Sequence, residues 1–183
     1  MGTQIAPQNS QMPSIDFGAR GIKFGSFEDL FRFAKCVVAS GLAPKGMEKP
    51  ETIAIAIEMG CELGLPPLQA LQNIAVINGR PAVWGDALLA ICQQSGLFCF
   101  ESFSESLTGD GDKQVATCTV RRKPNGQPVT RSFSVADAKR AGLWGKSGPW
   151  TQYAPRMLQM RARTFALRDT FADVLRGFTT IEE

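Results

Sequence analysis

The stretch that follows Pro155 constrains the fold of this chain most, because its pattern predicts a helix that is apolar on two sides. At about 100° per residue, Arg156 and Arg163 fall within about 20° of one another, and so do Arg161 and Arg168. One apolar strip lies between these two basic stripes and a second lies on the far side: Leu158, Ala162 and Phe165, and Met160, Leu167 and Phe171. We therefore expect a long, well-packed helix from about residue 151 to 170.

The rest of the chain alternates between helical and extended patterns. Helical patterns, bounded by capping residues, prolines and glycines, cover residues 26–41, 50–64, 68–71, 86–94 and 134–140. Asn78-Gly79 stands between two short β-type runs and predicts a hairpin. Extended patterns predict three strands, at 97–103, 114–122 and 128–134. The predicted fold class is α+β, with an antiparallel three-stranded sheet, packed helices and a β-hairpin.

A length of 183 residues suits one ordinary domain. Residues 1–25, rich in Gln, Ser, Gly and Pro, are predicted to form a flexible N-terminal leader. The domain is predicted to cover residues 26–178, followed by a C-terminal tail at 179–183. No apolar run approaches the roughly 18 residues of a membrane span. The five cysteines are scattered, which is typical of reduced thiols in a cytoplasmic protein.

The sequence offers little for covalent catalysis. It contains no histidine, which excludes histidine-dependent triads and mixed Cys/His zinc sites. No carboxylates form a spaced pair beside an obvious chemical partner. Gly145-Lys146-Ser147 resembles the end of a phosphate-binding loop, but Arg140 stands where that motif needs its first glycine. We therefore expect no catalytic residues, no metal site, no cofactor and no dependence on ATP.

Positive charge is concentrated between Arg121 and Arg168. This segment holds eleven Lys and Arg residues against one acid, Asp137, and so carries +10 of a chain whose formal net charge is +3. The remaining residues must then sum to −7. A basic region of this kind is typical of a polyanion partner, because Lys and Arg release counterions from phosphates.

The basic stripes of the last helix are the first candidate contacts for that partner, since the planar guanidinium donates two hydrogen bonds to a phosphate. Carboxylates elsewhere are the alternative partner for any single arginine, but not for all four. Arg121-Arg122-Lys123, at a strand end, extends the same groove. Trp144, in a glycine-rich loop, is the better candidate for stacking on a base, whereas Trp150 is predicted to anchor the core.

A family resemblance lies in the run from Gly148 to Ala162, GPWTQYAPRMLQMRA, with Arg168 farther on. This run resembles the signature of phage single-strand annealing proteins of the RecT and Red beta family. The basic strand end at Arg121 to Lys123 and the hairpin at Asn78-Gly79 are also similar to that family. The resemblance covers about residues 27–178 and is strongest after Thr117.

The resemblance implies an ATP-independent recombinase that binds single-stranded DNA and anneals complementary strands in phage homologous recombination. It implies a β-β-β-α core, a homo-oligomeric ring or filament, and work beside a phage exonuclease and the host single-strand-binding protein in the bacterial cytoplasm. Its DNA partners are a single strand and the annealed duplex intermediate. Pro155 departs from the family at a place that is basic in some relatives. The predicted DNA-binding residues are Arg80, Arg121, Arg122, Lys123, Trp144, Lys146, Arg156, Arg161, Arg163 and Arg168.

Three other functions remain open on the sequence. A metal-dependent nuclease would degrade the same oligonucleotides, although its acids would be expected beside the basic groove. A duplex-binding regulator would prefer a defined double-stranded site, but no helix-turn-helix pattern is present. A phage structural protein would assemble without DNA and would not anneal strands.

Overall fold

The computed structural model describes residues 16–18, 21–77 and 80–180. The contacts between residues divide the chain into two compact units, Met1–Ile55 and Ala56–Glu183, with the boundary inside helix α2 (Pro50–Glu62). The sequence predicted one domain over 26–178 instead. Each unit is described by itself below.

The first unit contains a short hairpin and a capped helix. Strands β1 (Asp16–Gly18) and β2 (Gly21–Lys23) pair in antiparallel register, within the segment that the sequence predicted as a flexible leader. Helix α1 (Phe27–Ala39) begins after Ser26, whose hydroxyl accepts a hydrogen bond from the backbone N–H of Asp29. The predicted helix at this position is confirmed, and it buries Leu30, Ala34 and Val37.

The second unit begins with the end of α2 and with helix α3 (Pro67–Asn73). The two helices approach so closely that a Cβ on Gly60 would lie 2.2 Å from the Cβ of Ala70. Strands β3 (Ile74–Ile77) and β4 (Arg80–Val83) then pair in antiparallel register, which confirms the predicted hairpin; its turn, Asn78-Gly79, lies outside the described residues. Strand β8 (Thr179–Thr180) joins this sheet, parallel to β4, in the segment predicted as a tail.

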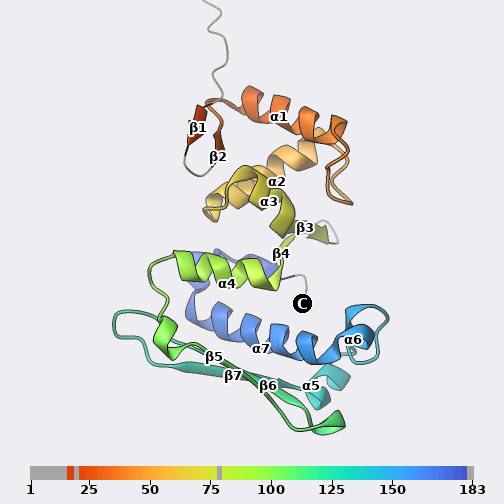
Figure 1. The fold of residues 1–183 in the computed structure, drawn as a ribbon, viewed down its shortest axis with the longest axis vertical. Helices are drawn as coiled ribbons and strands as arrows, with labels where there is room; N and C mark the ends of the chain where they lie inside the picture. The colour runs from red at the N-terminus through yellow and green to blue at the C-terminus, as the bar shows by residue number, and fades with distance from the viewer. Residues whose placement is uncertain (1–15, 19–20, 78–79, 181–183) are drawn as a thin grey trace, which may run out of the picture. The chain divides into compact units, whose positions relative to one another are not determined.

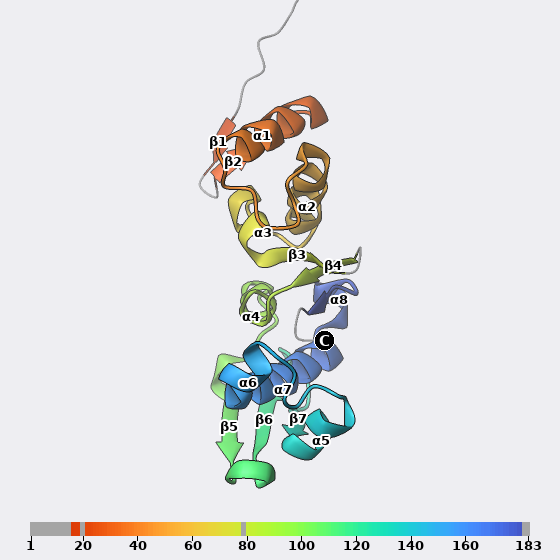
Figure 2. The same cartoon turned by 90° about the vertical axis from the view of Figure 1, so that its right-hand side faces the viewer.

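A second sheet carries the main helix. Strands β5 (Ser104–Thr108), β6 (Val115–Val120) and β7 (Val129–Ser134) form an antiparallel sheet with β6 in the centre. Helix α7 (Ala154–Thr170) packs on one face of this sheet, and α4 (Gly85–Gln94) lies on the other side of α7 (Figures 1 and 2). The predicted α+β class and the β-β-β-α core are confirmed.

The apolar strips of α7 explain its central position. Leu158 and Ala162 are fully buried, and so are Leu167 and Phe171, which represent the second strip. A helix between a sheet and another helix must be apolar on both sides. The predicted long helix is therefore confirmed, except that its first turn is a separate helix, α6 (Pro149–Gln152), because Tyr153 leaves the helical conformation.

The first predicted strand of this sheet was misplaced. Residues 97–103 form one isolated bridge, Phe98 with Arg122, and the short 3-10 helix η1 (Phe100–Ser102), while the strand begins at Ser104. Of the apolar residues that suggested the strand, Phe98 and Cys99 pack in the core, whereas Phe100 is exposed. Phe98 is buried, and its ring lies 5.8 Å from that of Phe171.

The remaining elements connect the sheet to α7. A 3-10 turn, η2 (Gly111–Lys113), lies between β5 and β6. Helix α5 (Val135–Arg140) begins with a capping box between Ser134 and Asp137, and α8 (Ala172–Leu175) follows α7. Trp150 is buried with its ring 6.4 Å from that of Phe133, so its predicted role as a core anchor is confirmed.

Among the described residues, none of the helices is both long and apolar enough to cross a bilayer. The described thiols are all free; Cys92, Cys99 and Cys118 are buried, and Cys36 and Cys61 are exposed.

Candidate nucleic-acid interface

Arg163 is the most deeply placed arginine of α7. Only 4% of its surface is exposed, and its Nε and Nη2 atoms donate to Glu105 on β5 at 2.7 and 2.6 Å. Its Nη1 donates to Asp86 in the first turn of α4 at 2.6 Å. Burial lowers the pKa of Arg163, but the hydrogen bonds and charges of both carboxylates outweigh burial and leave that pKa raised. The expectation that this guanidinium faces an open groove is wrong, because β5 turns Glu105 toward α7.

Arg161 also lies inside the unit. It is 9% exposed, and its guanidinium carbon lies 5.2 Å from the ring centre of Phe133 and 5.3 Å from that of Phe165. The two ring centres are themselves only 5.8 Å apart, so the guanidinium lies beside a pair of adjacent rings and gains cation–π attraction from each. The sequence predicted that this side chain faces the DNA backbone, and its burial corrects that expectation too.

Arg156 is the arginine of the helix that stands at the surface. Its side chain is 46% exposed, and Nη2 donates to Oδ1 of Asp86 at 3.0 Å. The same carboxylate oxygen accepts from Arg163, although the Asp86 side chain is itself 74% exposed. Asp86 therefore joins one surface arginine and one buried arginine.

Two exposed aromatic residues stand directly before the helices that carry this ion pair. Trp84 immediately precedes α4 and is 48% exposed; Tyr153 immediately precedes α7 and is 65% exposed. Because Asp86 and Arg156 are in contact, the two helices begin side by side, and Figure 1 shows their starts at the same end of the layer. We call Trp84, Asp86, Tyr153 and Arg156 the α4–α7 corner.

Of the four corner residues, only Arg156 is among the DNA-binding residues predicted from the sequence. Trp84 ended a β-type run and Asp86 began a helix, so each had an ordinary structural explanation. The available signal was a large aromatic residue at a strand end, directly before a helix start. Nothing in the sequence indicated that the starts of α4 and α7 lie together.

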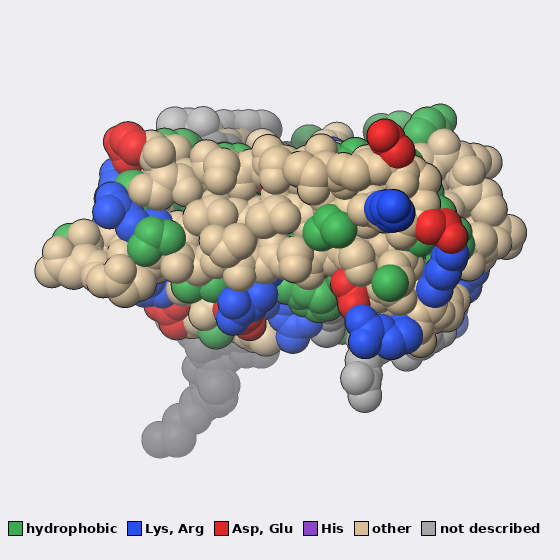
Figure 3. Space-filling model, turned by 90° about the horizontal axis from the view of Figure 1, so that it is seen from below, with side chains coloured by type: hydrophobic (Ala, Val, Ile, Leu, Met, Phe, Trp, Pro, Cys, Tyr) green, Lys and Arg blue, Asp and Glu red, His purple; other side chains and the backbone are tan. Residues whose placement is uncertain are grey.

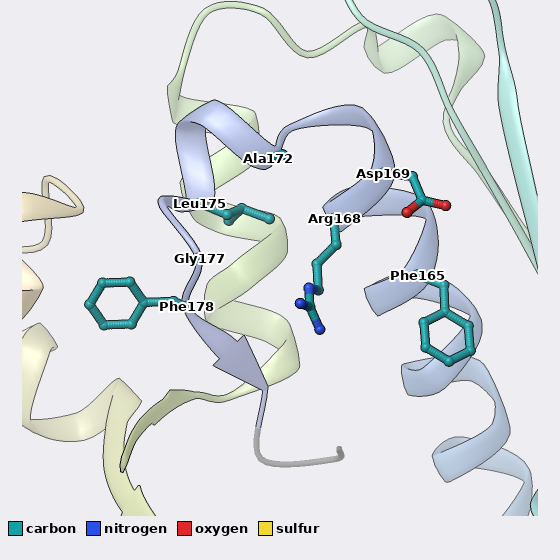
Figure 4. Close-up of a pocket in the computed structure, with 7 residues that line it drawn as sticks. All are labelled: Phe165, Arg168, Asp169, Ala172, Leu175, Gly177 and Phe178. Atoms are coloured by element: carbon teal, nitrogen blue, oxygen red, sulfur yellow. The ribbon is translucent and has the colours of Figure 1, made fainter.

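Arg168 lies at the other end of α7. Figure 4 shows its side chain reaching into the space between α7 and the α8–β8 segment. This space is a pocket of about 300 Å³, lined by Phe165, Arg168, Asp169, Ala172, Leu175, Gly177 and Phe178. Arg168 is half-buried there, among apolar side chains and the carboxylate of Asp169, and is thus partly accessible.

The basic cluster after β6 is dispersed by its own contacts. Arg121 is half-buried, and its Nη2 lies 2.9 Å from the sulfur of Cys99. Arg122 donates two hydrogen bonds to Asp173, of 2.5 and 2.7 Å, and these lower the pKa of the Asp173 carboxyl to about 2. Lys123 is exposed. The three side chains therefore do not form one continuous cationic surface.

The remaining predicted residues divide in the same way. Lys146 is exposed in the loop between α5 and α6, whereas Trp144 in the same loop is half-buried. The backbone of Arg80 begins β4, but its side chain lies outside the described residues.

Carboxylates from outside the basic segment fold back onto it. Arg131 contacts Asp169 and Lys139 contacts Asp112, each at 2.6 Å. The acids that pair with the segment from beyond its ends are Asp86, Glu105, Asp112, Asp169 and Asp173. The charge separation seen along the sequence is therefore reduced in space.

The face of the second sheet that points away from α7 carries mainly hydroxyl groups. Strand register places three rows side by side across it: Ser104, Thr119 and Thr130; Ser106, Thr117 and Ser132; Thr108, Val115 and Ser134. The hydroxyls of Thr119 and Thr130 lie 2.8 Å apart. Figure 3 views the molecule from this side and shows few charged side chains over the middle of the view.

In the described part of the chain, no group of three or more His, Cys, Asp or Glu residues is suited to hold a metal ion.

Comparison with known proteins gives no family assignment: no family model matches the chain, and no curated protein is significantly similar to it. The resemblance to the RecT and Red beta family therefore stays a prediction from the sequence.

Proposed function

We propose that this protein binds single-stranded DNA and anneals complementary strands without ATP, as a homo-oligomer in phage homologous recombination. The observation that carries the proposal is the α4–α7 corner, where Arg156 stands at the surface and an exposed aromatic residue directly precedes each of the two helices. An arginine binds a phosphate through two hydrogen bonds. An aromatic ring stacks on the face of an unpaired base, which contributes about 1–3 kcal/mol of binding free energy per base. That combination suits a single strand better than a duplex, whose bases are already stacked.

The other predicted contacts are assigned different roles by their positions. Lys123, Lys146 and Arg168 reach solvent and are proposed to meet phosphates along the strand. Arg161 and Arg163 are proposed as supports, since they fix α7 against the sheet and, through Asp86, against α4. Arg163 thus acts on the strand only by positioning the elements that carry the corner.

Annealing requires no bond to be made or broken in this proposal. The protein neutralises the phosphates of one strand, holds its bases extended and leaves their pairing edges open to a complement. Mutual repulsion between two strands falls when their phosphates are neutralised, and pairing then supplies the free energy. The β-β-β-α fold and the sequence run from Gly148 to Ala162 support this reading. The proposed partners are the protein itself, a phage exonuclease and the host single-strand-binding protein.

A fluorescence assay tests the proposal. Two complementary oligonucleotides, one with a fluorophore and one with a quencher, are mixed with the protein at low salt, without ATP and with or without magnesium. We expect quenching faster than for the oligonucleotides alone, in both magnesium conditions. Magnesium-dependent loss of full-length strands would support a nuclease instead.

A second candidate is a DNA-independent assembly protein of a phage. One observation favours it: several arginines of the basic segment are held by carboxylates of the same chain, as in the pairs Arg122–Asp173 and Arg131–Asp169. Internal pairing leaves less charge for a polyanion. This candidate predicts assembly in the absence of DNA and no acceleration of annealing in the same assay.

A further inference from the structure

Asp86 has an unusual position, because one of its oxygens serves two arginines. Oδ1 accepts from Arg156 at 3.0 Å and from Arg163 at 2.6 Å. The two arginines differ in their other contacts. Arg163 is also held by both oxygens of Glu105, whereas Arg156 stands at the surface. If the carboxylate withdraws, Arg163 keeps a bidentate partner while Arg156 becomes available to another anion.

The position of Asp86 suits a phosphate as well as a carboxylate. Both are anions that accept hydrogen bonds from a guanidinium. Asp86 lies in the first turn of α4, where the exposed backbone N–H groups favour negative charge. Trp84 and Tyr153 are exposed directly before the two helix starts, so we expect a strand stacked on these rings to bring its backbone near Arg156. An incoming phosphate would therefore replace the carboxylate on Arg156.

We infer that Asp86 is an internal competitor of the DNA backbone: it holds Arg156 when no strand is bound, and a phosphate of the single strand displaces it. This inference rests on the proposed function and adds the residue that sets its affinity. Glu105 keeps Arg163 in place during the exchange, so the packing of α7 does not change. The exchange is a swap of ionic partners, with no bond formed or broken.

The size of the effect follows from the exposure of the pair. An ion pair between solvent-exposed side chains is weak, and its loss before binding reduces affinity only slightly. Removing the competitor should tighten binding of a single strand about two- to five-fold at low salt. The gain should shrink as salt rises, because added ions screen both the pair and the strand.

The test compares Asp86→Asn with Asp112→Asn. Both aspartate side chains are 74% exposed and each contacts a cationic side chain at 2.6 Å, so the two substitutions remove the same formal charge from equally exposed carboxylates; the partner of Asp86 is the buried Arg163, and that of Asp112 is the half-exposed Lys139. Fluorescence anisotropy measures the Kd for a labelled oligothymidylate. We expect Asp86→Asn to bind about two- to five-fold more tightly than Asp112→Asn. Thermal unfolding checks both folds, and Asp86→Ser provides a second variant with a polar side chain in the first turn.

A double-mutant cycle with Arg156→Ala localises the effect. In the Arg156→Ala background, Asp86→Asn should bind no more tightly than Asp112→Asn, since no arginine remains to be released. If the wild-type protein binds but the two aspartate variants have equal Kd values, or if the gain persists without Arg156, this inference is overturned and the proposed function stands. If neither the wild type nor Asp86→Asn binds at low salt, both are overturned.

Discussion

Replacing Glu105 by glutamine tests whether Arg163 is a structural residue or a DNA contact. The change keeps the shape of the side chain and removes the charge that faces a guanidinium of 4% exposure. Removing one partner of a buried ion pair costs about 3–5 kcal/mol. Asp86 stays on the guanidinium and Glu105 is not completely buried, so we expect the low end, about 3 kcal/mol of unfolding free energy. For a unit of this size, the melting temperature should fall by roughly 10 °C.

Chemical and thermal unfolding, followed by circular dichroism, provide the measurement. Asp169→Asn is the matched control, because it breaks a pair with Arg131 that is half exposed at both ends, and we expect it to cost less than about 1 kcal/mol. A Glu105→Gln protein as stable as this control would refute the reasoning. Tighter DNA binding together with unchanged stability would indicate instead that Arg163 faces the strand, as the sequence suggested.

Tyr153→Ala should weaken single-strand binding by about 1–3 kcal/mol without lowering the melting temperature, and Trp84→Ala should do the same. Kd values equal to that of the wild-type protein, measured by anisotropy titration, would exclude stacking at the α4–α7 corner. The hydrogen bonds from Arg122 hold the pKa of Asp173 at about 2 against an ordinary 3.8, so this pair stabilises the fold above pH 3.8 and is lost as pH falls toward 2. Asp173→Asn should therefore flatten the melting temperature over that range, and an unchanged acid profile would contradict the pairing. Burial raises the pKa of two of the three buried thiols, Cys92 and Cys118, to about 12. Iodoacetamide at neutral pH should therefore modify the two exposed thiols first. Early labelling of a buried thiol, detected by mass spectrometry, would contradict the burial of these cysteines.

Patterns that depend on near neighbours predicted much of the fold. The two apolar strips of the last helix fixed its central position, because spacing along a helix determines which side chains share a face. Ser26 and Ser134 marked two helix starts correctly, since a cap forms with residues only three positions away. Asn78-Gly79 indicated the pairing of β3 with β4 for the same reason.

Patterns that depend on distant partners were not predictable. The strand β5 has the sequence SESLT, which lacks the apolar alternation that marks a half-buried strand, since the residue it turns inward at position 105 is a glutamate. The apolar stretch just before it drew the prediction instead. Only the contact with Arg163 explains a carboxylate on that face, and this contact joins residues 58 positions apart.

The candidate site shows the same limit more strongly. Charge counted along the chain predicted an arginine groove, but charge counted in space includes Asp86 and Glu105, which the fold brings to α7 from α4 and β5. Exposure and partners therefore decided which arginines remain candidates. Arg156 stays at the surface, and Arg161 and Arg163 do not.

The ion pair between Arg163 and Glu105 also affects the register in which strand β5 pairs with β6. With serine and threonine at every second position, β5 would lose little on its outer face by sliding two residues along β6. On the inner face such a slip would bring Leu107 or Phe103 to the place of Glu105 and leave a buried guanidinium facing a hydrocarbon side chain. The ion pair between Arg163 and Glu105 therefore favours one register of β5 on β6 among several that the hydroxyl rows alone would tolerate.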